Sequence, residues 1–348
     1  MKHLKLLIVL LILFGITACR EKQLSSVNQN QELQKLLPEI NPLKISLQGE
    51  ISNRNSEISG LAWYKENLIL LPQFPNKWKN GDAGTVYSIS KKQLINYING
   101  KLTQPILPQK LKFFSKGLEQ FDSKGSGYEA ILFDKNDVYI SIESFSHDET
   151  DGFVVKGTVS SEDTSIVLDA NTLRKIPLNI NLFNSSCETI LNFKQNIVTI
   201  FEANGKNINP NPLAYEFDNN LSFIKFLPFP TIEYRITDAT SVDENGKFWA
   251  MNYFYPGDKN LLNPAEDSLK LKFGYGKTHF LSEAVERIVQ LKISEDKIVE
   301  TNIPPIYLKL DVNNPSRNWE GLAKLDDLGF LIVTDKYPET ILAFVRYP

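Results

Sequence analysis

The sequence is poor in the side chains that bind soft metals or build disulfide frameworks. Its 348 residues include 2 cysteines, 2 methionines and 3 histidines. Because Cys19 lies in the N-terminal leader described below, Cys187 is the single cysteine of the remaining chain, and we expect no intrachain disulfide framework. A thiol on a predicted inner strand is more often a buried, inert side chain than a nucleophile, and we favour this interpretation for Cys187.

An excess of positive charge is also missing. The net charge of −3 at neutral pH argues against nucleic acid as a partner and provides no polybasic patch for a membrane surface. The chain contains no G-x-S-x-G elbow, no H-E-x-x-H motif and no glycine-rich phosphate loop. These absences exclude the common sequence signatures of serine hydrolases, zinc peptidases and P-loop enzymes.

The N-terminus has the pattern of an export signal. A positively charged stretch, residues 2–5, precedes the apolar run of residues 6–14, which is too short to span a bilayer but has the length of a signal-peptide core. Residues 16–19 follow with the sequence Ile-Thr-Ala-Cys, which resembles the lipobox of bacterial lipoproteins. In such proteins the cysteine thiol is acylated and becomes the new N-terminus. The alternative is an ordinary signal peptide with a chance cysteine.

This interpretation divides the chain into three parts. Residues 1–18 are predicted to be the signal peptide, residues 19–40 the lipidated Cys19 with a polar tether, and residues 41–348 the folded domain. Several acyl chains such as palmitate would anchor the protein firmly in the lipid bilayer, since each buried methylene contributes about 0.8 kcal/mol. Because position 20 is Arg and not Asp, we expect the outer membrane as the destination in a Gram-negative host.

Five similar segments recur along the rest of the chain. Each has a short apolar strand, a polar turn and a second apolar run, which together predict a β-hairpin. The first strands begin with Ser59-Gly60-Leu61-Ala62, Glu129-Ala130-Ile131-Leu132, Glu188-Thr189-Ile190-Leu191, Asp238-Ala239-Thr240-Ser241 and Glu320-Gly321-Leu322-Ala323. Each hairpin is followed by one or two further strand-like runs, so we predict an all-β fold built from four-stranded units.

Four strands per repeat indicate the blades of a β-propeller. Five blades are predicted, although the 82-residue spacing from Asp238 to Glu320 leaves room for a sixth. The last repeat ends one strand short after residues 340–346, whereas residues 43–51 precede the first repeat without a partner. We predict that these two segments pair and close the ring, because closure removes the open sheet edges.

A second polar position recurs at the far end of each hairpin. Residues equidistant from a turn lie opposite each other on neighbouring strands, with Cβ atoms about 5 Å apart. The predicted opposite pairs are Ser59/Gln73, Glu129/Glu143, Glu188/Glu202, Asp238/Asn252 and Glu320/Asp335. In a propeller the inner strands line one central channel, so these pairs are expected to crowd one channel mouth.

So many carboxylates in one place need compensating positive charge, because like charges raise one another's pKa. Calcium accepts six to eight oxygen ligands, and carboxylates and amides are suitable donors. The predicted ligands are Glu129, Glu188, Asp238, Glu320 and Asn252. Two alternatives stay open: an ion-pair network with Arg235, Arg317 and Lys336, or a mixed mouth filled with water.

The C-terminal repeat resembles a known family. Asn318-Trp319-Glu320-Gly321-Leu322-Ala323, the later strand ending on Asp335, and Thr340-Ile341-Leu342-Ala343-Phe344 are similar to the phytase-like family, also called "esterase-like activity of phytase". The other repeats match it more loosely, and Gln73 stands where the family usually has an acid. The resemblance covers roughly residues 58–348 and implies a β-propeller more firmly than it implies a substrate.

Together these features predict a membrane-anchored, metal-dependent hydrolase of phosphoric or carboxylic esters. A carboxylate-bound cation would polarise the substrate and lower the pKa of a water molecule. The predicted general bases are Glu143, Glu202 and Asp335. The alternative is a non-catalytic lipoprotein with a structural cation, whose channel mouth binds a small molecule or a protein. Free basic side chains beside the acids would favour a phosphate ester, and a sealed site would favour the structural role.

Overall fold

The computed structural model describes residues 36–122, 125–146, 149–162, 164–313 and 316–348. The predicted signal peptide, the lipidation site Cys19 and most of the tether lie outside the described residues. Within the described part of the chain, no helix has both the length and the apolar character needed to cross a bilayer.

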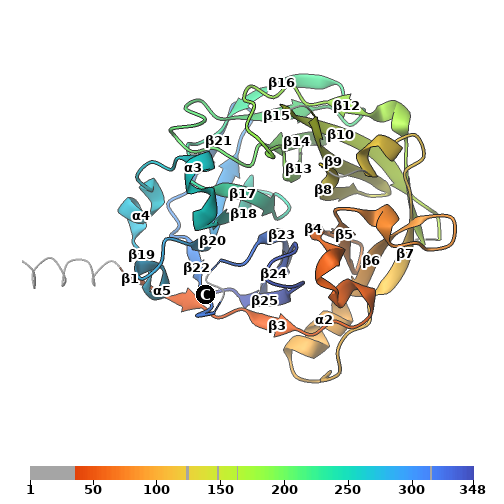
Figure 1. Ribbon diagram of the computed structural model, residues 1–348, viewed down its shortest axis with the longest axis horizontal. Helices are drawn as coiled ribbons and strands as arrows, with labels where there is room; N and C mark the ends of the chain where they lie inside the picture. The colour runs from red at the N-terminus through yellow and green to blue at the C-terminus, as the bar shows by residue number, and fades with distance from the viewer. Residues whose placement is uncertain (1–35, 123–124, 147–148, 163, 314–315) are drawn as a thin grey trace, which may run out of the picture.

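The strands form five blades around a common centre, as predicted (Figure 1). Blade 1 consists of β4 (Ile58–Tyr64), β5 (Asn67–Pro72), β6 (Gly84–Ser90) and β7 (Gln109–Phe114). Blade 2 consists of β8 (Ser126–Asp134), β9 (Asp137–Ser146), β10 (Glu149–Val159) and β11 (Ser165–Leu168), with β12 (Arg174–Lys175) beside β10. Blade 3 consists of β13 (Thr189–Phe193), β14 (Asn196–Ile200), β15 (Leu213–Phe217) and β16 (Phe223–Pro228).

Blades 4 and 5 complete the ring. Blade 4 consists of β17 (Arg235–Ala239), β18 (Lys247–Phe254), β20 (Val285–Ile293) and β22 (Ile306–Leu308), with β21 (Ile298–Glu300) also paired with β20. Blade 5 consists of β23 (Trp319–Leu325), β24 (Gly329–Thr334), β25 (Leu342–Arg346) and β3 (Leu43–Ile45). The innermost strands contact one another in the circular order β4, β8, β13, β17, β23 and back to β4. The molecule is therefore a five-bladed β-propeller.

The long interval before Glu320 does not form a sixth blade. It contains three short helices, α3 (Lys259–Leu262), α4 (Ser268–Phe273) and α5 (Lys277–Phe280), beside the outer strands of blade 4. The one other α-helix of the described residues, α2 (Lys91–Ile98), connects β6 to β7. Its first turn is fixed by a capping box between Ser90 and Gln93, which satisfies backbone donors that a helix start leaves free.

The N-terminal arm closes the ring, as the sequence predicts. Strand β3 pairs antiparallel with β25, with Leu342 opposite Ile45 and Phe344 opposite Leu43. The strand is shorter than the predicted 43–51, because residues 46–48 pair with Ile106 and a 3-10 helix begins at Glu50. Before β3, the arm adds β1 (Leu36–Leu37) to β19 (Tyr275–Gly276) and β2 (Glu39–Ile40) to β22.

Five apolar clusters lie between neighbouring blades and hold the ring together. Alternate residues of one strand point to opposite faces of its sheet. On β5, Ile69 and Leu71 therefore pack in the cluster shared with blade 2, whereas Leu68 and Leu70 pack in the cluster shared with blade 5. Because both faces are covered, the middle strands are continuous apolar runs rather than alternating ones.

Candidate functional site

Four of the five hairpins contain a β-bulge near the predicted polar position. The bulged residues are Ser59 in blade 1, Glu129 in blade 2, Thr237 in blade 4 and Glu320 in blade 5. A bulge inserts an extra residue and re-aims its side chain. The predicted pairs are consequently not directly opposite: Glu143, for example, faces Gly127 across the hairpin and not Glu129.

The repeat in blade 4 was assigned one residue too far along the chain. Thr237, not Asp238, occupies the position equivalent to Ser59. The same contact confirms it, because the Ser59 hydroxyl donates to the carbonyl of Tyr128 and the Thr237 hydroxyl to that of Trp319, each at 2.6 Å. A slip of one residue turns a strand side chain to the other face. The Asp238/Asn252 pairing is therefore wrong.

Asp238 lies in the central channel and binds backbone amides. Its Oδ2 accepts a hydrogen bond from the amide of Leu322 (2.7 Å), and its Oδ1 from the amide of Ala239 (2.8 Å). Burial raises the pKa of this carboxyl well above its usual range, although the amides of Leu322, Ala239 and Leu61 oppose the shift. The side chain joins inner strands of blades 4, 5 and 1, which is a structural role.

Asn252 is also engaged elsewhere. Its Nδ2 donates to the carbonyls of Glu233 and Arg235, each at 3.0 Å, and its Oδ1 accepts from Nε of Arg287 at 2.7 Å. Both ends of the amide are used inside blade 4. The structure therefore separates Asn252, like Asp238, from the other predicted site residues.

The remaining predicted acids do gather at one mouth of the channel. They are Glu129, Glu143, Glu188, Glu202, Glu320 and Asp335, and Glu57 joins them. Each of the five whose pKa is shifted feels the charge of at least one other member of this set. We call these seven residues the acid cluster.

Burial dominates the electrostatics of the acid cluster. It raises the pKa of Glu129 to about 7, against a hydrogen bond from Gln73, and the charge of Asp335 adds to the rise. Burial together with the charge of Glu57 raises the pKa of Asp335 to about 7. Several of these groups therefore carry protons near neutral pH.

The same cause acts on three further members. Burial raises the pKa of Glu143 well above its usual range, and the charge of Glu129 adds to this. For Glu188 the neighbouring charges of Glu202 and Glu320 reinforce burial. For Glu320 they come first from Asp335 and Glu129, while a hydrogen bond from Asn318 opposes the rise.

Arg235 is the basic residue at the centre of the acid cluster. Its guanidinium forms an ion pair with Glu202 and binds Asp258, with Nη2 3.1 Å and Nε 3.2 Å from Oδ2. Burial opposes its charge, but the carboxylates of Glu202, Glu188 and Asp258 outweigh burial and raise the pKa of Arg235. Its charge is balanced by the carboxylates of Glu202 and Asp258, and 12% of its side chain is exposed.

The other two predicted cations lie elsewhere. Lys336 pairs with Glu57 at 3.3 Å, and Lys77 binds the same carboxylate at 3.2 Å. Arg317 binds Glu286 in blade 4, outside the acid cluster. Of the ion-pair network predicted as an alternative, the structure thus has the Arg235 and Lys336 parts.

A cavity of about 590 Å³ opens beside the acid cluster, between blades 3, 4 and 5. We call it the mouth cavity. Its lining combines carboxyl, amide, hydroxyl and aromatic groups: Asn184, Glu188, Arg235, Tyr253, Tyr255, Asp258, Ser316, Asn318, Glu320, Tyr337 and Pro338. Glu188 and Glu320 are the predicted acids on this wall, whereas Glu129 and the predicted bases Glu143, Glu202 and Asp335 are not part of it. The site is open to solvent, not sealed.

The donors of the acid cluster have the chemistry that calcium requires, but their arrangement is less favourable. Three carboxylate oxygens are buried without a hydrogen-bond partner: Oε2 of Glu188, Oε1 of Glu202 and Oδ1 of Asp335. Such atoms call for a cation, a proton or a donor from a ligand. Within the described residues, however, no three Asp, Glu, His or Cys side chains are placed to hold a metal ion together.

Most of the other cavity residues were missed by the sequence analysis. Asn184, Tyr255 and Tyr337 lie in loops that do not repeat between blades. Tyr253 lies at a repeat position. Once the register of blade 4 is corrected, it is equivalent to Gln73 and Glu202 in the other blades. Cys187 is buried beneath the site, and burial raises its pKa to about 12, which fits the predicted inert thiol.

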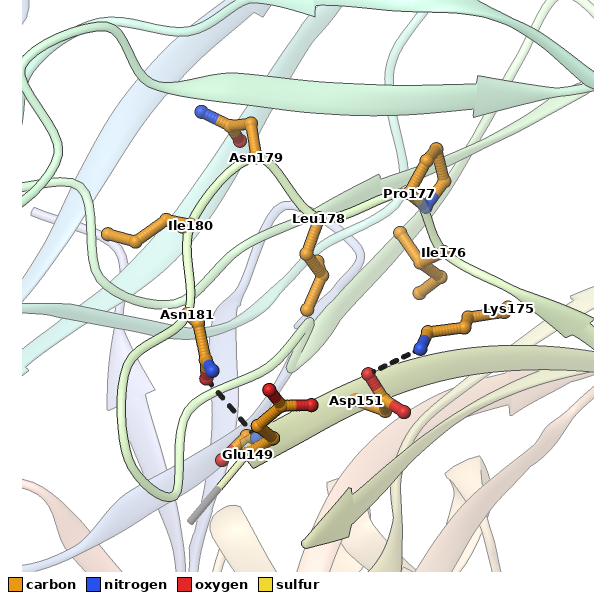
Figure 2. Close-up of a pocket in the computed structure, with 10 residues that line it drawn as sticks. Glu149, Asp151, Lys175, Ile176, Pro177, Leu178, Asn179, Ile180 and Asn181 are labelled. Atoms are coloured by element: carbon orange, nitrogen blue, oxygen red, sulfur yellow. Dashed lines mark hydrogen bonds and ion pairs between the residues drawn. The ribbon is translucent and has the colours of Figure 1, made fainter. Parts of the chain in front are cut away.

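A second cavity, of about 510 Å³, lies beside β10 and the segment after β12 (Figure 2). Asp151 and Lys175 form an ion pair of 2.7 Å on its wall, and Oδ1 of Asn181 accepts from the amide of Thr150 at 3.2 Å. Its one basic group thus has one acidic partner. Its carboxylate Asp151 therefore provides a control for the acids of the mouth cavity.

No family model matches the sequence, and no curated protein matches it. Solved structures are similar to it at low identity. A glucose dehydrogenase is 10% identical, with a TM-score of 0.45 over 89% of this chain and 100% of that one. The soluble aldose sugar dehydrogenase of Escherichia coli is 10% identical, with a TM-score of 0.42 over 88% and 100%. The GH43_1 enzyme of Xanthomonas citri is 8% identical, with a TM-score of 0.44 over 90% and 93%. The assignment of the propeller rests on the strand pairing described above, and the phytase-like resemblance stays a prediction.

Proposed function

We propose that the protein is a hydrolase of carboxylic esters whose active site is the mouth cavity. The observation that carries this proposal is the pair of carboxyl groups, Glu188 and Glu320, on the wall of an open cavity. The charge of Glu320 adds to burial in raising the pKa of Glu188, so Glu188 keeps its proton while Glu320 loses one. Such a pair supplies both a general acid and a general base.

Hydrogen bonding assigns the two roles. Nδ2 of Asn318 donates to Oε1 of Glu320 at 2.5 Å and to Oδ2 of Asp335 at 3.4 Å, and a donor favours the ionised form. Oε2 of Glu188 is buried without a partner, which favours the protonated form. We therefore assign Glu320 as the base and Glu188 as the acid.

The reaction follows from these roles. Glu320 takes a proton from the water that attacks the ester carbonyl, and Glu188 gives its proton to the departing alkoxide. The products are a carboxylic acid and an alcohol. The pair is restored when Glu320 releases a proton to solvent and Glu188 takes one up.

The cavity favours carboxylic over phosphoric esters. A phosphoric ester is an anion and needs a free cation beside the reacting group. Arg235, the basic residue of the cavity wall, is bound to Glu202 and Asp258. An anionic substrate would therefore face the carboxyl groups of the wall without a free cation to balance its charge.

The test is hydrolysis of 4-nitrophenyl acetate, butyrate and phosphate by the purified mature domain. We expect turnover of the carboxylic esters with a bell-shaped pH profile. Glu188→Gln and Glu320→Gln should each lower kcat by about 10² to 10⁴, the usual contribution of a general acid or base. Asp151→Asn, which changes a carboxylate in the second cavity, should leave kcat unchanged.

Two results would contradict the proposal. One is no turnover of any ester by a correctly folded protein, which would favour the alternative of a non-catalytic binding protein. The other is an equal loss of activity in Asp151→Asn and the two mouth variants. Melting curves of all variants show whether the fold is intact.

We also propose that Cys19 is lipidated and holds this domain on a membrane outside the cytoplasm. The support is the lipobox-like sequence at residues 16–19 and the polar tether that follows it. Cys19→Ser should abolish labelling by a fatty-acid analogue in the native host. Unchanged labelling would overturn the assignment.

A further inference from the structure

The wall of the mouth cavity contains other polar and aromatic side chains besides its acid pair. Besides Glu188 and Glu320 it contains neutral polar groups and three tyrosines, two from blade 4 and one from blade 5. Cavities of several hundred Å³ are the size that holds small-molecule ligands, and a few polar groups fix the orientation of the ligand. The charge and the hydrogen-bonding groups of the wall therefore determine which ligand fits.

Charge excludes one class of ligand. The wall has three carboxyl groups, those of Glu188, Asp258 and Glu320, and the guanidinium of Arg235. Since Arg235 is bound to Asp258 on the wall and to Glu202 behind it, the wall has no spare cation among the described residues. A phosphate, sulfate or carboxylate group in the ligand would be repelled or would have to break these pairs.

Hydrogen-bonding capacity points to a ligand rich in hydroxyl groups. One acceptor of the wall, Oε2 of Glu188, has no hydrogen-bond partner, and the amides of Asn184 and Asn318 and the hydroxyl of Ser316 lie on the same wall. A hydroxyl group both donates and accepts, so it can pair with a carboxyl in either protonation state and with an amide. A buried acceptor without a partner costs about 1–3 kcal/mol, which a donating ligand would recover.

Two tyrosines give the wall an apolar part. Tyr255 and Tyr337 are 52% and 54% exposed, although aromatic rings are usually more covered. The guanidinium of Arg54 lies 4.5 Å from the centre of the Tyr337 ring and covers one of its faces. Exposed rings next to hydroxyl-binding groups suit a ligand with both C–H and O–H surfaces.

We infer that the mouth cavity binds an uncharged polyhydroxylated group, a sugar ring or similar polyol, as part of its substrate. The inference rests on the proposed function and makes it more specific: the ester would be one formed by a sugar or polyol. The water-exposed tyrosines hold the C–H face, and Asn184, Glu188 and Asn318 bind the hydroxyls.

The experiment measures binding without turnover. Titration calorimetry is done with glucose, galactose, xylose and arabinose, and with two charged relatives, glucose 6-phosphate and glucosamine. We expect at least one neutral sugar to bind, and to bind at least tenfold more tightly than the 6-phosphate. Tyr255→Ala and Asn184→Ala should each weaken this binding about tenfold or more, whereas Phe223→Ala, an exposed aromatic residue on the outer strand of blade 3, should not.

The outcomes separate this inference from the proposed function. No binding of any neutral sugar by the folded protein overturns the inference, even if simple esters are hydrolysed. Tighter binding of glucosamine than of glucose also overturns it, because the wall then selects a cation. Sugar binding that depends on Tyr255 and Asn184, in a protein that hydrolyses no ester, supports the cavity assignment while the hydrolase proposal fails.

Discussion

Two buried polar regions of the propeller treat charge in opposite ways. In blade 4, Arg287 binds both oxygens of Asp267, with Nη1 2.7 Å from Oδ2 and Nη2 3.1 Å from Oδ1. Arg317 binds Glu286 with Nε and Nη2, and the indole of Trp319 donates to the same carboxylate at 2.9 Å. Each of these two buried carboxylates has its own arginine.

The acid cluster lacks this balance. Seven carboxyl groups share Arg235, Lys77 and Lys336, and three of their buried oxygens have no partner. Burying an unpaired charge is costly, so paired ions belong to the framework, whereas unpaired ones cost stability and need another reason to persist. Perturbed groups that border a cavity are typical of functional sites. The acid cluster thus differs from the ion pairs of blade 4 in its lack of structural pairing.

Breaking a pair in the balanced region should have the largest effect. Arg287 is fully buried, and its loss leaves the carboxyl group of Asp267 without its ion-pair partner. We expect Arg287→Met to lower the free energy of unfolding by about 3–5 kcal/mol, measured by urea denaturation. Arg174→Met, at an exposed arginine of blade 2, is the control and should change it by less than about 0.5 kcal/mol.

An equal, small effect of Arg287→Met and Arg174→Met would contradict the comparison. If Arg287→Met does not fold, the double variant Arg287→Met with Asp267→Leu decides. Removing both charges should recover stability relative to the single variant, because no unpaired carboxylate is left. No recovery would show that the arginine acts through packing alone.

The same contrast shows what the sequence could predict. The hairpins, five blades and ring closure follow from local signals: apolar runs, polar turns and a strand at each end of the chain that needed a partner. The convergence of Glu129, Glu188 and Glu320 follows from their repeat positions. These features depend on periodicity, which one sequence displays.

Two other features could not be predicted from the sequence. Bulges at Ser59, Glu129, Thr237 and Glu320 shift the register by a residue, and nothing in the alternation of side chains marks them. In blade 4 the bulged residue, equivalent to Glu129 and Glu320, is Thr237, so the next residue, Asp238, lies outside the acid cluster. The cavity wall depends on loops of blades 3 to 5 that differ from one another, so no repeat could reveal Tyr255 or Asn184.

An intermediate effect is expected from pH: the protein should lose stability as the pH rises through about 7. Glu129 has an ordinary pKa of 4.5, raised to about 7 by burial in the folded protein, and Asp335 rises from 3.8 to about 7. The folded state therefore binds more protons than the unfolded state between these values. Their contribution to stability is complete below the unfolded pKa and is lost as pH rises through about 7.

We expect Glu129 alone to cost about 2 to 3 kcal/mol of stability between pH 5 and pH 8, since its folded-state proton is lost up to about pH 7 and one pKa unit corresponds to about 1.4 kcal/mol. His279, whose pKa is lowered by burial, acts in the opposite direction in this window. The quantity to measure is therefore the difference in unfolding free energy between the parent and Glu129→Gln at each pH. The parent should lose stability relative to the variant as pH rises, and a difference that is constant would refute the assignment.

Calcium should give the smallest effect and would make the two regions more alike. The predicted ligands that remain in the acid cluster are Glu129, Glu188 and Glu320. No three acids of the described residues are placed to hold an ion together, so calcium would have to draw these carboxylates closer, and they can bind it only when ionised. Calcium should therefore stabilise the protein at pH 8 and much less at pH 6. At ten times the dissociation constant the gain is about 1.4 kcal/mol, seen as a higher Tm that chelator reverses. Glu188→Gln should reduce this gain, whereas Asp238→Asn should leave it in place, because Asp238 binds the amides of Leu322 and Ala239. A calcium effect that is equal at both pH values, or that depends on Asp238, would place the ion outside the acid cluster.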